Sequence, residues 1–200
     1  MPGKQYFVAA YEKCSLKKEL MQPIKRRALF TIILIAGLAW IFVSVDWAGT
    51  STAGEIPAPR QGFLAPNLTL NTPDGETFAL SELRGQAVLV NLWATWCPPC
   101  RAEMPTIQKI YEEYKNQGFV VLGINMTYQD DPFAVVPFVQ EYELSFPILI
   151  EETGEVAQKY ELRSLPSSFF INRSGIIQEV VIGGPMSEAL LRTRIESLLK

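Results

Sequence analysis

The sequence predicts an α/β domain with a mixed, mainly parallel central sheet over residues 61–200, preceded by one transmembrane helix. Continuous apolar runs alternate with segments of helical spacing, which is typical of a sheet whose parallel strands are covered by helices. Turn residues at Asp74-Gly75 and Arg173-Ser174-Gly175 predict an antiparallel hairpin near each end of the domain. An uncharged apolar run ahead of the domain is long enough to span a bilayer.

The elements of the domain can be placed from these patterns. Ala87–Trp93 and Phe119–Asn125 are nearly continuous apolar runs, as expected for strands buried on both faces. Apolar residues recur at helical spacing from Met104 to Tyr114, and Gly118 ends that helix. The other predicted strands are Asn67–Leu70, Glu76–Ala79, Pro147–Ile150, Ser168–Asn172 and Ile176–Ile182. The predicted helices are Pro98–Lys115, Pro132–Tyr142 (interrupted or kinked at Pro137), Glu155–Tyr160, and one capped by Ser187 that runs through Leu199.

The apolar run Ala28–Val45 contains 18 residues without a charge. As a helix it would span about 27 Å, close to the hydrocarbon thickness of a bilayer. Basic residues precede it, and Trp40 and Trp47 lie near its far end, so the positive-inside rule predicts a cytoplasmic tail over 1–27 and residues 46–200 outside. A retained signal-anchor is therefore expected. A cleaved signal peptide and a buried core helix are the alternatives.

The segment around this anchor has two further features. Residues 46–60 are rich in Gly, Ser, Thr, Ala and Pro, a composition that predicts a flexible linker. Met21 opens a stretch that reads as an ordinary signal-anchor start, so residues 1–20 are a candidate mis-assigned extension. In that case Cys14 is absent from the protein; otherwise it is a lone cytoplasmic thiol with no assigned role.

Composition and charge exclude several functions. The chain has 200 residues and no histidine, which removes His-dependent nucleophilic catalysis, His-bearing zinc or copper sites and His-ligated haem. Residues 1–27 carry seven Lys/Arg and two Glu, a net charge of +5, so the rest of the chain sums to −8 against a total of −3. An acidic domain is a poor match for nucleic acid.

The chemistry of the chain is concentrated at Cys97 and Cys100, which directly follow a predicted buried strand and begin a predicted helix. A C-x-x-C pair in this position brings both sulfurs within disulfide reach, and the helix N-terminus favours a thiolate. We expect Cys97 to be exposed and nucleophilic, and Cys100, one turn inside, to be the resolving cysteine. Pro98 and Pro99 fit a first helical turn, because they lack the N–H groups that would be unpaired there.

Other roles for the two cysteines fit less well. A structural disulfide would close a loop too short to stabilise much. Zinc would need two more ligands, and neither a histidine nor another cysteine of the outer region supplies them. A c-type haem site needs histidine where Arg101 stands, and a copper chaperone needs a distal histidine. The expectation is a redox dithiol without cofactor or metal.

The stretch VNLWATWCPPCRAEMP, Val90 to Pro105, resembles the thioredoxin superfamily. It is most similar to the membrane-anchored TlpA/ResA-like thiol–disulfide oxidoreductases, whose domain is of the AhpC/TSA-redoxin type. The resemblance covers about residues 61–200. It implies a thioredoxin-like fold, in which helices flank a central mixed sheet, with an N-terminal β-hairpin and a central helical insertion at about 127–146.

The resemblance also assigns roles outside the cysteine motif. Pro166 matches the family's cis-proline, which would face the cysteines and leave the backbone of Leu165 free to pair with an extended substrate. Trp96, with Pro98 and Pro99, would line the substrate surface, and Trp96 would also shield the disulfide. Trp93 reads as a core residue.

Proton handling is expected to fall to Glu103. Asn91 stands where ordinary thioredoxins carry a buried aspartate that handles the proton of the second cysteine, and an amide cannot titrate. Glu103, three residues after Cys100, is the candidate proton relay, since a carboxylate buried near a thiol would have a raised pKa. The alternative is a solvated glutamate that interacts with the helix N-terminus.

The sequence therefore predicts a membrane-anchored thiol–disulfide oxidoreductase that works on the outer face of the cytoplasmic membrane. The family implies net reduction of disulfides in apocytochrome c or in envelope and spore-assembly proteins, with electrons from a membrane-embedded thiol carrier. The alternatives are a thiol oxidase or isomerase that uses the same residues, a thiol peroxidase, and a non-catalytic binding module. No nucleic acid or metal partner is expected.

Overall fold

The computed structural model of the protein describes residues 29–40 and 56–200. Residues 29–40 form a helix with exposed side chains. The α/β domain belongs to a separate compact unit, Ser51–Lys200. Within the described residues, no helix has both the length and the apolar character needed to cross a membrane. The predicted tail 1–27, both ends of the predicted anchor 28–45 and most of the linker 46–60 lie outside the described residues.

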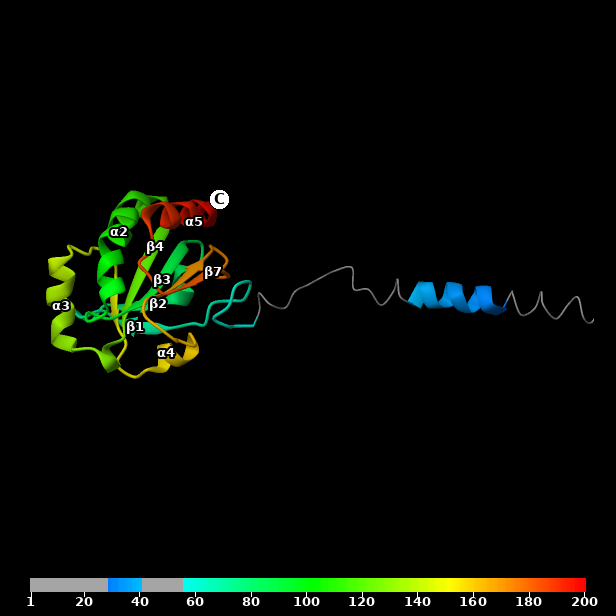
Figure 1. Ribbon diagram of the computed structural model, residues 1–200, viewed down its shortest axis with the longest axis horizontal. Helices are drawn as coiled ribbons and strands as arrows, with labels where there is room; N and C mark the ends of the chain where they lie inside the picture. Colours follow the sequence, from blue (N-terminus) through cyan, green and yellow to red (C-terminus); the bar gives the residue numbers. More distant parts are fainter. Residues whose placement is uncertain (1–28, 41–55) are drawn as a thin grey trace, which may run out of the picture. The chain divides into compact units, whose positions relative to one another are not determined.

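The domain is built on one mixed seven-stranded sheet with the order β2-β1-β5-β4-β3-β6-β7 (Figure 1). The central strands β3, β4 and β5 are parallel, and antiparallel strands lie on both sides of them. The expectation of a mainly parallel sheet is therefore wrong: four of the six strand pairings within residues 56–200 are antiparallel, because each terminal hairpin adds its strands in the antiparallel sense. The two predicted hairpins are β1–β2 and β6–β7, at the two ends of the sheet. The strands are β1 Thr69–Asn71, β2 Thr77–Ala79, β3 Ala87–Trp93, β4 Phe119–Asn125, β5 Ile148–Ile150, β6 Ser167–Ile171 and β7 Ile177–Ile182.

The alternation of side chains along β3 divides the core into two clusters. Successive side chains of a strand point to opposite faces of the sheet. Ala87, Leu89 and Trp93 pack with residues of α2 (Pro98–Tyr114), α3 (Pro132–Glu141) and α5 (Glu188–Leu199). Val88, Val90 and Leu92 pack on the other face with α4 (Glu155–Lys159) and the segment before β1. Asn91 shares the odd-numbered positions, so its side chain points to the face covered by α2.

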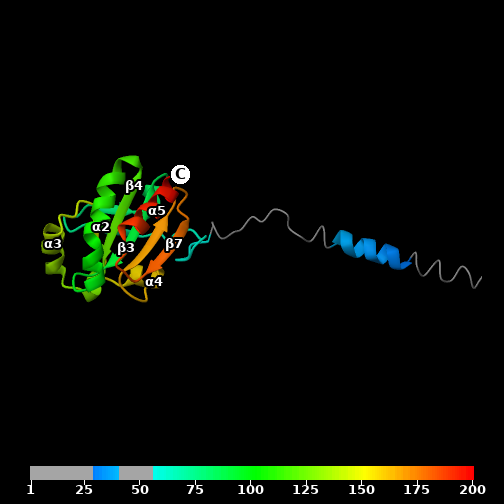
Figure 2. The same cartoon turned by 45° about the horizontal axis from the view of Figure 1, so that its top comes forward.

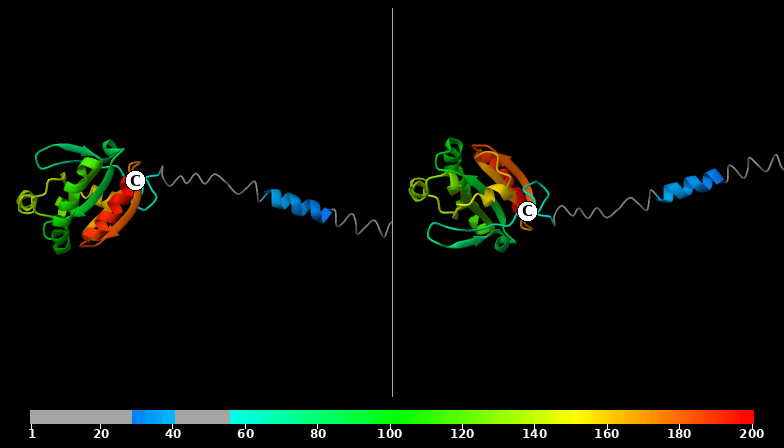
Figure 3. Two further views of the ribbon diagram at one scale, coloured as in Figure 1. Left: turned by 90° about the horizontal axis from the view of Figure 1, so that it is seen from above. Right: turned by 90° about the horizontal axis from the view of Figure 1, so that it is seen from below.

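The helices have a clear spatial arrangement. α2 and α5 lie side by side on one face of the sheet (Figures 1 and 2). α3, in the predicted insertion, lies on the outer side of α2, and α5 and β7 lie at the opposite side of the domain (Figure 3). Short 3-10 helices, η2 Leu80–Leu83, η3 Lys115–Gln117 and η4 Thr127–Gln129, complete the connections. The N-terminus of α2 directly follows the central strand β3, with only a short loop between them.

The predicted thioredoxin-like architecture is confirmed, with local differences. The bounds predicted for the strands 87–93 and 119–125 match β3 and β4, and Ser187 caps α5 through a bond from the Leu190 N–H at 3.3 Å. The predicted interruption at Pro137 is wrong, because α3 runs through it. A proline inside a helix removes one main-chain hydrogen bond, and at the start of this helix the Asp131 side chain accepts a hydrogen bond from the Phe133 N–H. The opening hairpin begins at Thr69 rather than Asn67; ahead of it the Leu68 main-chain oxygen accepts from the Leu80 N–H, and the Asn67 side chain accepts from the Ser81 N–H.

A candidate redox site above a buried carboxyl group

The two cysteines of the motif are joined. Their sulfurs are 2.10 Å apart, a disulfide, and their Cα atoms are 5.3 Å apart. Cys97 is the N-cap of α2, and its Sγ accepts a hydrogen bond from the Cys100 N–H at 3.3 Å. An N-cap side chain normally satisfies an unpaired N–H of the first helical turn. The sulfur of Cys97 therefore lies where the helix offers donors and a partial positive charge.

The prediction that Cys97 is exposed is wrong for this disulfide form. Cys97 is only 2% exposed and Cys100 is completely buried. Both belong to the apolar cluster on the α2 face, which also contains Trp93 and Met104. The disulfide explains the burial of Cys97, because the bond to the buried Cys100 draws its side chain onto the first turn of the helix.

The residues around the disulfide divide into buried and exposed ones. Pro98 and Pro99 occupy the first two helical positions, as predicted; Pro98 is exposed and Pro99 half-buried. Trp96 is 57% exposed, and its indole N–H donates to the main-chain oxygen of Gln129 at 3.0 Å. Trp93 is fully buried, as predicted for a core residue. A large apolar side chain is thus displayed directly beside a buried disulfide.

Glu103 lies inside the protein rather than in solvent. Its side chain is completely buried, which rules out the solvated alternative. One carboxylate oxygen accepts from Asn91 Nδ2 at 2.9 Å, and the other accepts from the Met186 N–H at 3.2 Å. Burial raises the pKa of the Glu103 carboxyl above its usual value of 4.5, while the two hydrogen bonds act in the opposite direction. The site therefore holds a carboxyl group that binds a proton more readily than a surface glutamate does.

Asn91 is the residue that connects this carboxyl to the sheet. Its Nδ2 donates both to Glu103 and to the Ser168 hydroxyl, each at 2.9 Å. Its Oδ1 is buried and has no hydrogen-bond partner. Buried polar atoms are rarely left unpaired. The amide therefore has a spare acceptor beside a carboxyl group. If the amide group rotates by half a turn, Oδ1 can accept a hydrogen bond from the O–H of a protonated Glu103.

The Leu165–Pro166 loop completes the site. The peptide bond between these residues is cis, the isomer that the family resemblance implies. Leu165 packs against the apolar cluster that contains both cysteines. Within residues 56–200, no main-chain hydrogen bond engages Leu165, whereas the Pro166 oxygen accepts from the Gly183 N–H at 2.8 Å. The fold thus brings the loop, which also packs against the apolar cluster of the other face, next to the cysteines and Glu103.

The loop between β7 and α5, residues 183–186, is a part of the site that the sequence analysis did not identify. It supplies the Met186 N–H to Glu103 and the Gly183 N–H to Pro166. A Cβ on Gly184 would lie 2.7 Å from Glu103 Oε2 and 2.8 Å from Pro166 Cγ. Only glycine permits so close an approach. The Gly183-Gly184-Pro185 sequence was the available signal, since such a run marks an unusual backbone.

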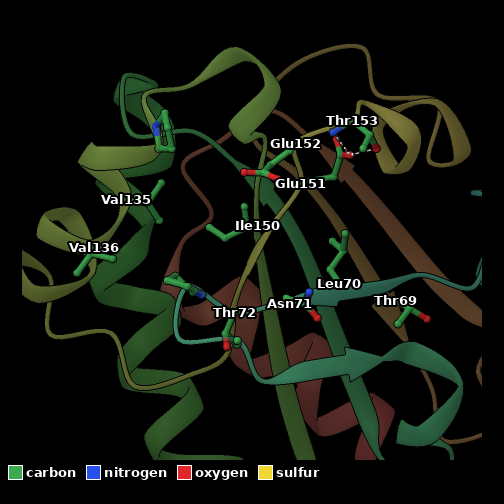
Figure 4. A pocket seen from close by; sticks show the side chains of 13 residues that line it. Thr69, Leu70, Asn71, Thr72, Val135, Val136, Ile150, Glu151, Glu152 and Thr153 are labelled. Atoms are coloured by element: carbon green, nitrogen blue, oxygen red, sulfur yellow. Dashed lines mark hydrogen bonds between the residues drawn. The ribbon is translucent and has the colours of Figure 1, made fainter.

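The surface also has a hollow that lies apart from the cysteines. A hollow between β1, α3 and the loop after β5 is lined by residues such as Asn71, Val136 and Glu152 (Figure 4). Its lining includes neither cysteine. In the part of the chain that the structure describes, no three His, Cys, Asp or Glu side chains are grouped so that they could hold a metal ion.

The fold and the site together define the class of protein: a thioredoxin-like α/β domain with a dithiol–disulfide pair at the start of a helix. Residues 62–180 match the model of the AhpC/TSA family. The chain is 37% identical over 171 residues to the thiol-disulfide oxidoreductase ResA of Halalkalibacterium halodurans, covering 86% of this chain and 92% of that protein.

Solved structures of thioredoxin-like proteins are also similar to this chain. A thiol:disulfide interchange protein of the thioredoxin family from Chlorobium tepidum is 29% identical, with a TM-score of 0.63 over 68% of this chain and 96% of that one. StoA from Bacillus subtilis is 28% identical, with a TM-score of 0.57 over 64% of this chain and 96% of that one. The chain belongs to the AhpC/TSA family and, within the thioredoxin superfamily, to the TlpA/ResA-like thiol–disulfide oxidoreductases.

Proposed function

We propose that the protein reduces disulfides of other proteins outside the cytoplasmic membrane through a Cys97/Cys100 dithiol–disulfide cycle. The observation that carries the proposal is the disulfide at the N-terminus of α2, where a helix donor already contacts Cys97 Sγ. The same donor would stabilise a thiolate on Cys97 after reduction. Cys97 is accordingly the nucleophile and Cys100 the resolving cysteine.

The reaction consists of two exchanges. The Cys97 thiolate attacks one sulfur of the substrate disulfide, forms a mixed disulfide and releases the other substrate sulfur as a thiolate, which takes up a proton. Cys100 then loses its proton and attacks Cys97 Sγ. This step releases the second substrate thiol and leaves the Cys97–Cys100 disulfide. The substrate gains two electrons and two protons: both electrons come from the two cysteines, one proton comes from Cys100, and the other comes from solvent, which received it when Cys97 ionised.

Glu103 is the proton relay in this proposal. Cys100 is buried and needs a base when it resolves the mixed disulfide, and Glu103 lies three residues further along the same helix. A buried carboxyl with a raised pKa exchanges a proton closer to neutral pH than a solvated one. Leu165 and Pro166, together with Trp96, Pro98 and Pro99, form the surface that receives the substrate. The free main chain of Leu165 suits pairing with an extended peptide.

The proposed location rests on the apolar segment 28–45, which we take as a single-pass anchor with residues 1–27 in the cytoplasm. Its described part is a helix whose exposed side chains include Ile32, Ile33 and Ile35. A helix that is apolar on every side is stable where lipid surrounds it. In this arrangement electrons come from a membrane-embedded thiol carrier, and the substrates include apocytochrome c or envelope and spore-assembly proteins.

The decisive experiment is substrate trapping in cells. Cys100→Ala leaves Cys97 able to form a mixed disulfide that cannot be resolved, so covalent adducts with substrates should accumulate. They should vanish on treatment with a reductant. Cys97→Ala in the same background is the control, and it should give none. A Cys100→Ala chain without adducts would contradict the proposal and favour a non-catalytic binding module.

The direction of electron flow is tested by the reduction potential of the Cys97–Cys100 pair. A value near the thioredoxin potential of about −270 mV supports a reductase, and one near the DsbA potential of about −120 mV supports an oxidase with the same residues. Hydroperoxide turnover would instead identify a thiol peroxidase. The potential is measured by equilibration of the full chain in thiol–disulfide buffers, and the Cys14→Ser variant removes interference from the third cysteine.

A further inference from the structure

Two consecutive residues ahead of Cys97 are hydrogen-bonded to two consecutive residues of the insertion. The Thr95 N–H donates to Asp130 Oδ2 at 2.6 Å, and the Thr95 hydroxyl donates to Asp130 Oδ1 at 2.5 Å. The Trp96 indole donates to the main-chain oxygen of Gln129 at 3.0 Å. The loop that leads into the cysteine motif is therefore held by a segment more than thirty residues away in the chain.

Asp130 is itself fixed from its other side. Asn125, at the buried end of β4, donates from Nδ2 to Asp130 Oδ2 at 2.8 Å. The Asp131 N–H donates to Asp130 Oδ1 at 2.9 Å. The two carboxylate oxygens thus accept from four donors: two on Thr95, one on Asn125 of β4, and one on the adjacent Asp131. Hydrogen bonds to an ionised carboxylate are roughly twice as strong as neutral ones, so this link between sheet and loop is firm.

The insertion also contacts the residue that follows the second cysteine. The Arg101 guanidinium lies over the ring of Phe138 in α3, 5.1 Å from its centroid, and forms an ion pair with Glu141 at 3.2 Å. It also donates to the Thr95 main-chain oxygen at 3.3 Å. The insertion therefore reaches the cysteine motif from both ends, and Thr95 is engaged at its N–H, its hydroxyl and its main-chain oxygen.

This arrangement bears on substrate binding because of Trp96. An exposed side chain that must be ordered when a partner docks costs conformational entropy at that moment, and ordering it beforehand removes the cost. Trp96 is more than half exposed, yet its indole N–H and the preceding residue are both fixed. The side chain most available to a protein substrate is therefore held in place before the substrate arrives.

We propose that Asp130 is a positioning residue for exchange with protein disulfides: it holds Thr95 and thereby presents Trp96 in the orientation that receives the substrate. The inference rests on the proposed function, since it assumes that Cys97 reacts with disulfides of other proteins. Asp130 acts through Thr95 and Trp96 and contacts neither sulfur in this structure. It should govern the docking of a large substrate more than the exchange chemistry at Cys97.

The test compares Asp130→Asn with Asp131→Asn in the full chain carrying Cys14→Ser. An asparagine has only one acceptor oxygen. At position 130 its amide N–H₂ would face N–H and O–H groups whose hydrogen bonds the carboxylate now accepts, and it could not accept them. Asp131 carries the same charge one residue away, but it caps α3 by accepting from the Phe133 N–H, and asparagine caps equally well. Reduction of insulin, a protein disulfide, is measured beside reduction of oxidised glutathione, a small one.

For Asp130→Asn we expect KM for insulin to rise about tenfold or more, in keeping with the sensitivity of catalysis to small misplacements. The rate with oxidised glutathione should change less than about twofold, because a small disulfide does not need the Trp96 surface. Asp131→Asn should match the parent on both substrates. Equal losses on insulin and glutathione, or insulin kinetics that match those of Asp131→Asn, would overturn the inference.

A second variant keeps the test decisive if Asp130→Asn fails to fold. Thr95→Val removes only the hydroxyl bond to Asp130 and keeps the N–H bond, so KM for insulin should rise by a smaller factor. Where Asp130→Asn does fold, the effects of the two substitutions should not add in the double variant, since both break the same link between Thr95 and Asp130. Unchanged insulin kinetics in Thr95→Val would overturn the inference. A parent chain that reduces neither insulin nor glutathione would overturn the proposed function instead.

Discussion

The domain buries two glutamates completely, and the surroundings of the two carboxylates differ. Glu151, in the loop after β5, accepts from the Thr153 N–H, the Thr153 hydroxyl and the Gly154 N–H at 2.7–3.0 Å (Figure 4). Glu103, beneath the disulfide, accepts only one bond on each oxygen, at 2.9 and 3.2 Å. The first carboxylate has donors from its own loop, whereas the second depends on partners from distant segments.

The difference separates a structural carboxylate from one suited to proton transfer. A buried charge costs free energy unless hydrogen bonds compensate for the lost water. At Glu151 the charge organises a turn, and its donors belong to the next three residues. At Glu103 the compensation is partial, burial raises the pKa of the carboxyl, and a spare acceptor on Asn91 lies alongside. The same substitution should therefore lower activity but not stability at Glu103, and lower stability but not activity at Glu151.

The largest effect is expected for Glu103→Gln on activity. Removal of a general acid or base typically costs 10²–10⁴-fold, so we expect disulfide reduction near neutral pH to slow by about 10²-fold. Stopped-flow measurement of a single turnover isolates the chemical step. The fold should persist, because the Asn91 amide can turn over and accept from the new amide group. Rates equal to those of the parent at every pH would remove Glu103 from the mechanism.

Glu151→Gln is the matched change and should act on stability instead. It places an amide N–H₂ beside the Gly154 N–H and removes the charge that strengthens the remaining bonds. We expect a loss of about 1–2 kcal/mol in the free energy of unfolding, the range for a weakened buried hydrogen-bond group. Urea denaturation measures it. The rate of disulfide reduction per folded molecule should match the parent, and a large loss of rate would break the contrast between the two glutamates.

The pH dependence of stability sharpens the comparison further. Because the pKa of Glu103 is raised in the folded protein, the folded state binds a proton that the unfolded chain has already lost above pH 4.5. The contribution of Glu103 to stability is therefore greatest below that pH, and it falls as the pH rises through the folded pKa. The difference between the free energy of unfolding of Glu103→Gln and that of the parent (variant minus parent) should therefore rise as the pH increases from 4.5 through the raised pKa of the folded protein. A difference that stays level or falls with pH would contradict the raised pKa.

The smallest effect is expected at Glu152, the exposed neighbour of Glu151. Glu152→Gln makes the same chemical change on the surface, where substitutions usually alter stability by less than about 0.5 kcal/mol. Neither the denaturation midpoint nor the exchange rate should move measurably. This variant is the control for both buried positions, and a loss comparable to that of Glu151→Gln would show that net charge rather than burial is responsible.

The sequence by itself determined the central strands, the helix that follows them and the redox pair. The bounds of β3 and β4 could be predicted to the residue because their apolar runs are continuous. A strand buried on both faces shows this pattern in its own sequence, without information from the rest of the fold. The C-x-x-C pair at the start of α2 follows from local geometry alone. The expectation that Glu103 is the proton carrier came from family resemblance, and its burial agrees with that role.

Only the tertiary structure decided how the site is enclosed. It buried Cys97, although the sequence predicted an exposed nucleophile. It joined Glu103 to the Met186 N–H, 83 residues further along, and Asn91 to Ser168, 77 residues further along. It also joined Thr95 to Asp130 across 35 residues. Hydropathy patterns and capping signals report which face a residue occupies, but partners of this kind depend on how distant segments pack, which no local pattern encodes.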